Sequence, residues 1–392
     1  MPYRPLFCAS AKPVPIPQER KLSLRGSYYN KMQRILVINP GSTSTKIALY
    51  EAKEGEAIKN VFTRSIVHSE DELKQFSWVM EQLDYRYDCI INTLFDEGVE
   101  LSSLTCVVSR GGMIPPCASG AYRVNDAMIQ YMMESKIDTH ISNVGCAVAY
   151  RFEKALGIPS YIYDPVTVDE LDPIARITGL PELPKVSRGH ALNSHAMAHR
   201  CARDIMHKPL SECTFIVQHL GGGCSVWLFK GGRAIDMYSD DDAGFAPERC
   251  GKLQAMNLIK LCYSGKYTLS EITKKVRGNA GLRAHLGTSN AVEVEKMIES
   301  GNEHAKLVYE ALAYGVAKGI GDLATAVCGK VDRIILTGGL SHSNMLTGWI
   351  KKRVEFIAPV EIMAGEFEME ALAEGALRVM RKQEMATEFS IN

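Results

Sequence analysis

The sequence predicts an α/β protein built from two similar lobes, and three glycine turns carry this prediction. The four apolar residues Ile35–Ile38 form a run too short for a helix and rich in β-branched side chains, which indicates a buried strand. Asn39-Pro40-Gly41 then turns the chain into a second strand at 46–50. A similar pair of apolar runs flanks Gly221-Gly222-Gly223, 180 residues after Gly41, and a third run ends at Gly338-Gly339. Two such hairpins in one chain indicate a duplicated domain.

The polar residues of the first turn are suited to phosphate oxygens. Ser42 and Thr43 offer hydroxyl and backbone N–H groups, while Gly41 lets a ligand approach the backbone closely. Glycine and serine also occur in hairpins for turn geometry alone, so one such turn is weak evidence. Three glycine turns that each follow a strand favour a nucleotide held between two lobes.

Length and composition exclude several classes of protein. The 392 residues suffice for two domains, and 46% hydrophobic and 23% charged residues are typical of a globular chain. Lys plus Arg equals Asp plus Glu, at 45 each, so no basic excess is available for nucleic acid or an anionic membrane. No apolar stretch reaches the length of about 20 residues that a transmembrane helix needs.

The cysteines point to a reducing compartment. There are 11 of them, an odd number, without any Cys-x-x-Cys pair, so neither a disulfide framework nor a zinc site is indicated. Cys106 lies within an apolar run, where a free thiol packs as a small core residue. We therefore expect the protein in the cytoplasm.

The two ends of the chain are expected to be tails. Residues 1–31 contain several prolines and basic residues but no apolar segment typical of a secretory signal, and they are expected to be disordered. Whether they are translated, or precede a true start at Met32, stays open. Residues 385–392 are expected to form a short C-terminal tail.

Between the two hairpins, strands and helices are expected to alternate. Residues 51–102 show no clear motif. Asn125-Asp126 and Ser142-Asn143 are typical N-caps of helices. Arg110 and Asp164 each follow a strand, and ligands of open α/β sheets collect at such strand ends. The expected elements are a strand over 101–109, helices over 127–136 and 142–156, and a strand over 160–163.

The second half of the chain continues this alternation. Small residues such as Gly315 and Gly319 allow close packing of a long helix, in the core or at a dimer interface. The expected elements are a helix over 194–207, the strands around 221–223, a strand over 234–238, a helix over 302–328, strands at 334–338 and 360–363, and a helix over 369–382.

Residues 33–382 resemble the acetate and butyrate kinase family, a branch of the actin-like ATPase superfamily, and the resemblance is greatest to its butyrate kinases. Ordered blocks along the chain carry this resemblance. They are VINPGSTSTK ending at Lys46, SRGGM at Met113, YDPVTVDE at Glu170, GHALN at Asn193, HLGGG at Gly223, PERCG at Gly251, LTGG at Gly339 and GEFEMEAL at Leu372.

The resemblance implies a duplicated ribonuclease H-like fold, with mixed sheets flanked by helices and a central nucleotide cleft. It implies an N-terminal lobe over 32–185 that is completed by 366–384, and a C-terminal nucleotide-binding lobe over 186–365. It also implies reversible phosphorylation of butyrate by ATP with Mg²⁺, in a homodimer or higher homo-oligomer. A branched-chain fatty acid kinase, an acetate kinase and a non-catalytic nucleotide-binding regulator stay open as alternatives.

The resemblance also assigns roles to residues. The implied catalytic residues are Arg110, Asp164, His190 and Arg249. Nucleotide and phosphate are expected at Asn39, Ser42, Thr43, His219, Gly221, Gly222, Gly223, Gly338 and Gly339. The pocket for the acid is expected at Met113, Ile114 and His140. Arg110 departs from the family pattern. In acetate kinases three residues separate this arginine from the glycine pair, whereas here Arg110 directly precedes the pair.

Magnesium is expected at two carboxylates. Asp164 is the first, and Glu366 is selected as the second, with Glu368 and Glu370 as alternatives because acidic residues also favour helix N-termini. The chemistry needs no general base, since a short-chain carboxylate is already ionised at neutral pH. What it needs is positioning and positive charge around the transferring phosphoryl group.

Overall fold

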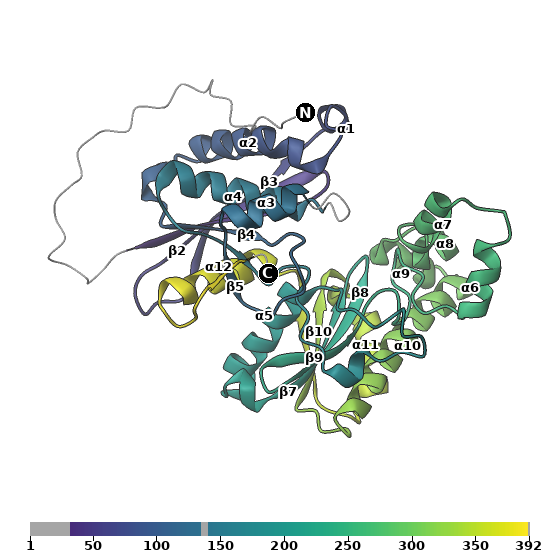
Figure 1. Ribbon diagram of the computed structural model, residues 1–392. Coiled ribbons are helices and arrows are strands. Elements are labelled where there is room, and N and C mark those ends of the chain that lie inside the picture. The colour runs from purple at the N-terminus through teal and green to yellow at the C-terminus, as the bar shows by residue number, and fades with distance from the viewer. Residues whose placement is uncertain (1–31, 135–139, 391–392) are drawn as a thin grey trace, which may run out of the picture.

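The computed structural model describes residues 32–134 and 140–390, arranged in two lobes (Figure 1). The expected tail over 1–31 and the end of the helix expected over 127–136 lie outside the described residues. Each lobe is built on one sheet with helices on both faces. None of the helices in the described part is long and apolar enough to cross a membrane.

The first sheet has seven strands in the order β12-β5-β6-β4-β1-β2-β3, and the second has five in the order β11-β10-β7-β8-β9. The first contains β1 (Gln33–Pro40), β2 (Ser44–Ala52), β3 (Lys59–Val67), β4 (Cys106–Arg110), β5 (Ala121–Arg123), β6 (Ser160–Tyr163) and β12 (Thr387–Glu388). The second contains β7 (Thr214–Leu220), β8 (Cys224–Lys230), β9 (Arg233–Tyr238), β10 (Arg333–Gly338) and β11 (Val360–Ala364).

The two sheets share one topology. β1, β2 and β3 pair antiparallel, and β4 and β6 then continue the sheet in parallel with β1. β7, β8 and β9 likewise pair antiparallel, and β10 and β11 continue in parallel with β7. The prediction of a duplicated two-lobed α/β fold is confirmed.

Helices cover both faces of the first sheet, which explains why β1 is a continuous apolar run. Leu36 and Ile38 pack into the core beneath α2 and α4, whereas Ile35 and Val37 pack towards α12. The helices of this lobe are α1 (Glu70–Lys74), α2 (Leu83–Asp96), α3 (Asp126–Glu134), α4 (Ser142–Leu156) and α12 (Glu368–Met380).

The second sheet is covered in the same way, with α10 and α11 on one face and α5 on the other. Its helices are α5 (Ala191–Cys201), α6 (Ala255–Cys262), α7 (Leu269–Val276), α8 (Gly281–Leu286), α9 (Ala291–Glu299), α10 (Glu303–Ala326) and α11 (Asn344–Val354). Single helical turns lie at Val79–Gln82, Leu101–Ser103, Pro173–Arg176, Ala202–Met206, Leu210–Glu212 and Gly339–His342.

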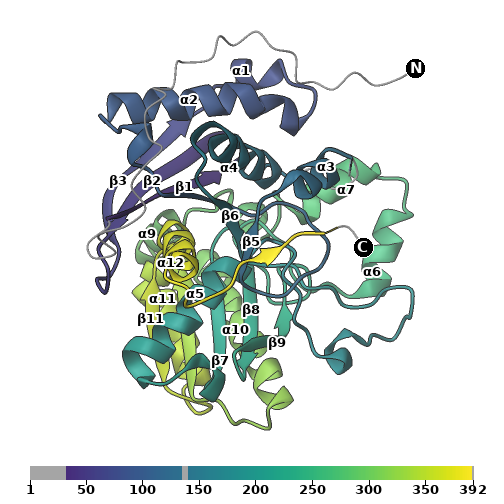
Figure 2. The ribbon, with the colours of Figure 1, turned by 60° about the vertical axis from the view of Figure 1, so that its left-hand side comes forward.

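Two helices cross between the lobes. α5 follows β6 of the first sheet in the chain but packs on β7 and β10 of the second. α12 follows β11 of the second sheet but packs on β1, β4 and β6 of the first. The two helices also contact each other, and Figure 2 shows them between the sheets. The limits expected for the lobes, 32–185 with 366–384 and 186–365, stay a prediction.

Two local expectations are wrong. Ser142 and Asn143 do not cap α4, whose N-cap is Ile141 without a side-chain bond. Asn143 instead accepts a hydrogen bond from the backbone N–H of Met113 at 2.8 Å. Residues 385–390 are not a free tail, because Thr387–Glu388 adds strand β12 beside β5 and Phe389 is buried. Both contacts are with distant parts of the chain, so local sequence does not reveal them.

Candidate active site

Three polar side chains meet where β1, β4 and α12 come together. Asn39 is the penultimate residue of β1, and its Nδ2 donates to Oε2 of Glu368 at 2.8 Å. Arg110 ends β4, and its Nη1 lies 3.4 Å from the same oxygen. Glu368 begins α12, so its carboxylate is held at the edge of the first sheet. β1 and β4 are neighbouring parallel strands, so their carboxyl ends lie together.

The second lobe adds two stacked histidines. His190 precedes α5 and His219 lies near the end of β7, and their rings stack 3.9 Å apart at an angle of 12°. Loss of hydration lowers the pKa of His190 to about 4, with Arg110 and Arg249 also lowering it and Glu368 and Asp240 opposing them. These charged groups therefore lie near the ring.

His219 is buried, and burial holds its pKa well below the usual range, with smaller contributions from His190 and Arg110. Both imidazoles are thus neutral near pH 7. We call Asn39, Arg110, Glu368, His190 and His219 the interlobe cluster. Four of its members are residues expected at the site, and the structure brings them together.

Arg249 lies against the glycine turn of the second hairpin. Its Nε is 3.0 Å from Oδ2 of Asp240, an ion-pair contact without the alignment of a hydrogen bond. A Cβ added to Gly223 would stand 2.6 Å from the same Asp240 oxygen. A side chain at residue 223 would therefore push the Asp240 carboxylate out of its present position beside Arg249.

The turn after β1 is held from behind by a buried arginine that the sequence did not reveal. Arg86 of α2 is only 1% exposed, and it donates to the carbonyl oxygens of Ser42 and Ser44 at 3.1 and 3.0 Å. It also donates to Thr45 Oγ1 at 2.8 Å. Burial lowers its pKa to about 10, so it stays charged at neutral pH. The Ser42 and Thr43 side chains remain exposed.

The third glycine turn lies against the end of β7, next to the second turn. Gly338 has a φ of +91°, and its Cα hydrogen faces the backbone of Leu220, where a Cβ would overlap the carbonyl oxygen. Its neighbour Gly339 has no heavy atom within 4 Å of the position that a Cβ would take. The ends of β7 and β10 are therefore in close contact beside His219.

Asp164 makes its contacts away from Glu368 and Arg110. Its Oδ1 accepts from Ser119 Oγ at 2.6 Å and from Gly120 N at 2.8 Å, in a left-handed backbone conformation with φ of 42°. It is 3% exposed, and burial raises its pKa. Asp164 is thus a buried carboxylate outside the interlobe cluster. Its expected catalytic and metal-binding roles stay predictions.

The residues expected to line the acid pocket differ in their surroundings. Loss of hydration lowers the pKa of His140, and the nearby charge of Arg110 lowers it further. Met113 is half-buried, with its backbone N–H bound to Asn143. Ile114 belongs to the core cluster of β5 and α3. Of the three, His140 has the clearest link to the interlobe cluster.

Residues 32–134 and 140–390 contain no group of three or more His, Cys, Asp or Glu side chains arranged to hold a metal. Magnesium commonly takes only one or two carboxylates, together with substrate phosphates and water. Glu368, which contacts Asn39 and Arg110, fits that pattern. Glu366 is exposed, and Glu370 lies 3.8 Å from Arg200. The geometry therefore favours Glu368 over the selected Glu366.

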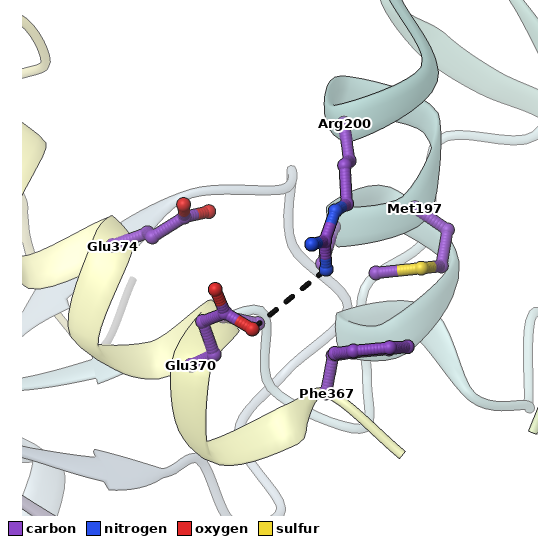
Figure 3. Close-up of a pocket in the computed structure, with 7 residues that line it drawn as sticks. Met197, Arg200, Phe367, Glu370 and Glu374 are labelled. Carbon is purple, nitrogen blue, oxygen red and sulfur yellow. Dashed lines mark ion pairs between the residues drawn. The ribbon is translucent and has the colours of Figure 1, made fainter. Parts of the chain in front are cut away.

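A small pocket separates α5 from α12 next to the cluster (Figure 3). Arg200 of α5 reaches between Phe367 and Glu370, 4.9 Å from the Phe367 ring centre. Arg203, one turn further on, lies 3.4 Å from Glu374. These charged pairs join α12 to α5 and to the helical turn that follows α5.

Comparisons with known proteins identify the family. A probable butyrate kinase 2 from Caldanaerobacter subterraneus subsp. tengcongensis is 48% identical over 354 residues, which cover 90% of this chain and 98% of the relative. This chain belongs to the acetokinase family. The family model itself matches residues 188–368, and a butyrate kinase 2 from Clostridium acetobutylicum is 43% identical over 91% of this chain and 99% of its own.

The acetokinase fold is found in solved structures as well. The crystal structure of Porphyromonas gingivalis acetate kinase superimposes with a TM-score of 0.72, at 17% identity, and covers 89% of this chain and 100% of its own. The predicted family and fold are confirmed. The roles expected for individual residues stay predictions.

Proposed function

We propose that this protein catalyses the reversible transfer of the γ-phosphoryl group of ATP to butyrate, which gives butyryl phosphate and ADP. The observation that carries this proposal is the 48% identity over 98% of a probable butyrate kinase. A branched-chain acid or acetate is the alternative acceptor. The proposal places the protein in the cytoplasm, in accord with the free thiols of the ten described cysteines.

Charge and positioning would provide the catalysis. The butyrate carboxylate attacks the γ-phosphorus, the bond from phosphorus to the β,γ-bridging oxygen breaks, and ADP leaves with that electron pair. Arg110 and Arg249 would balance the negative charge on the transferring group, and Asn39 would orient it. The low pKa of His190 makes its ring a neutral hydrogen-bond donor in this role.

The three glycine turns would hold the nucleotide phosphates. The turn with Ser42 and Thr43 lies on Arg86, which has no carboxylate partner among the described residues. The turn at 221–223 lies on Arg249. The turn at 338–339 contacts Leu220, which directly precedes the 221–223 turn. Mg²⁺, held by Glu368, would neutralise phosphate charge. Asp164 is the second carboxylate proposed for it.

A copy of the same chain is the proposed partner, in a homodimer or larger homo-oligomer. Exposed apolar residues occur on α6, where Met256 is 65% and Ile259 is 49% exposed. Sedimentation would determine the assembly state.

An acid panel tests the proposed reaction. Initial rates with ATP and Mg²⁺ are measured for acetate, propionate, butyrate, isobutyrate and valerate. We expect kcat/KM for butyrate to exceed that for acetate by at least about tenfold, since a hydrophobic pocket discriminates roughly 10- to 200-fold per methylene. A preference for acetate would contradict the butyrate assignment, and no turnover with any acid would favour a regulator.

A further inference from the structure

The stacked histidines are fixed in one proton arrangement by the groups behind them. Neutral imidazole carries its proton on either Nδ1 or Nε2, and the hydrogen bond at one nitrogen decides which. In both His190 and His219, Nδ1 faces a neighbouring side chain. That side chain is itself oriented by backbone or indole N–H groups, which can only donate hydrogen bonds. The proton positions can therefore be derived from the contacts.

At His190 the deciding residue is Ser225 of β8. Its Oγ receives the indole N–H of Trp227 at 3.2 Å and the backbone N–H of His190 at 3.3 Å. Both groups are donors only, so they occupy the acceptor positions of the hydroxyl. The hydroxyl proton is left for Nδ1 of His190, at 2.9 Å. Nδ1 thus accepts, and the ring proton of His190 is on Nε2.

At His219 the deciding residue is Asn193 of α5. The backbone N–H of Phe367 can only donate, and it meets Oδ1 of Asn193 at 3.4 Å. The amide nitrogen therefore faces the other way, 3.0 Å from Nδ1 of His219 and 3.3 Å from Oγ1 of Thr337. Thr337 in turn donates to the carbonyl oxygen of Gly365 at 3.4 Å, so it can accept from Asn193. Nδ1 of His219 thus accepts from the Asn193 amide, and the ring proton of His219 is on Nε2.

The free edge of His219 faces the glycine turn. A Cβ placed on Gly221 would lie 3.0 Å from Nε2 of His219, so this nitrogen lies directly against the turn. His190 stacks on the same ring with the charges of Arg110, Arg249, Glu368 and Asp240 around it. Two neutral rings can stack at 3.9 Å without the repulsion that two imidazolium ions would suffer.

We propose that Asn193 and Ser225 are positioning residues that hold His219 and His190 as a stacked pair of Nε2–H donors for the oxygens of the transferred phosphoryl group. The ligand part of this inference rests on the proposed function. The proton positions do not, because they follow from the hydrogen bonds of the protein alone. Near neutral pH, two fixed neutral donors would serve without gaining or losing a proton.

Asn193→Asp inverts the arrangement at His219 with little change of shape. A carboxylate can only accept, so it requires a proton on Nδ1, and Nε2 then carries one only while the ring is an imidazolium. We expect the kcat of N193D, divided by that of the wild type at each pH, to fall as pH rises. At alkaline pH the loss should reach the order of 10²-fold, as when one transition-state donor is removed.

The neighbouring Ser194→Ala provides a matched control on the same helix. Ser194 is buried, and within the described residues its Oγ has no hydrogen-bond partner. The kcat of the Ser194→Ala variant should follow the wild-type pH profile. For His190, Ser225→Ala should lower kcat and leave KM nearly unchanged, and Ser225→Thr, which keeps the hydroxyl, should restore much of the loss.

Nitrogen-15 NMR of histidine-labelled protein reads the protons directly and requires no turnover. The wild type should show Nε2 protonated and Nδ1 unprotonated in both rings, assigned with His190→Gln and His219→Gln, and N193D should show Nδ1 of His219 protonated. A proton on Nδ1 of either wild-type ring, or an N193D profile parallel to the wild type, would overturn the proposal. Failure to phosphorylate any acid would instead refute the proposed function, and the NMR result would still test the proton positions.

Discussion

Acidification should destabilise this protein through the stacked histidines. The usual histidine pKa is 6.5, whereas that of His190 is lowered to about 4 and that of His219 lies well below the usual range. Between these values the unfolded chain binds more protons than the folded one, so the free energy of unfolding falls as pH falls. From about pH 7 to about pH 4.5 the loss is on the order of 2 kcal/mol for His190, and His219 adds a loss in the same direction.

Urea unfolding across this pH range measures the effect. The free energy of unfolding of the wild type, minus that of the double variant His190→Gln/His219→Gln, should decrease by at least about 2 kcal/mol from about pH 7 to about pH 4.5. It should be constant above about pH 7. His304→Gln at an exposed site is the control and should parallel the wild type. A difference that stays constant down to about pH 4.5 would show that the folded pair accepts protons, and would refute the reasoning.

Three further sets of variants test the site and the fold. Glu368→Gln should lower kcat on the order of 10²-fold, whereas the matched Glu366→Gln should not, and equal losses would contradict the choice between them. Arg110→Ala and Arg249→Ala should each lower kcat/KM on the order of 10²-fold with an unchanged circular dichroism spectrum; a near-normal value removes that arginine from the site. Gly338→Ala should destabilise the fold by about 3 kcal/mol or more, because its φ is +91° and a Cβ would overlap the end of β7. A thermal melt that matches the wild type would contradict this.

The elements that depend on local sequence were predictable. The strand over 160–163 and the helix over 142–156 have the expected bounds. The strand follows from an apolar run of neighbouring residues, whereas the helix was expected from an N-cap that does not form. The two hairpins were likewise found from apolar runs. In contrast, α2 and β3 lie within 51–102, where charged and apolar residues alternate without a clear period, and were not predicted.

The site was predictable only in part. Arg110 was placed at a strand end by sequence, and the structure confirms that position. The selection among Glu366, Glu368 and Glu370 depends on how α12 is rotated on the first sheet, which sequence does not encode locally. The decisive contact joins Glu368 to Asn39, 329 residues away. Arg86 was missed for a similar reason, since only the packing of α2 behind the turn distinguishes it from a surface arginine.

The exchange of α5 and α12 between the sheets makes the assembly of the site and the closure of the lobes a single event. The N-terminal ends of these helices meet where Asn193 accepts from the backbone N–H of Phe367, across 174 residues of sequence. Asn193 also holds the ring of His219, and Phe367 directly precedes Glu368. Any rotation of the lobes that separates α5 from α12 therefore moves His219 away from Glu368. Geometry competent for phosphoryl transfer then exists only while the crossing helices are in contact, which restricts the chemistry to a closed site.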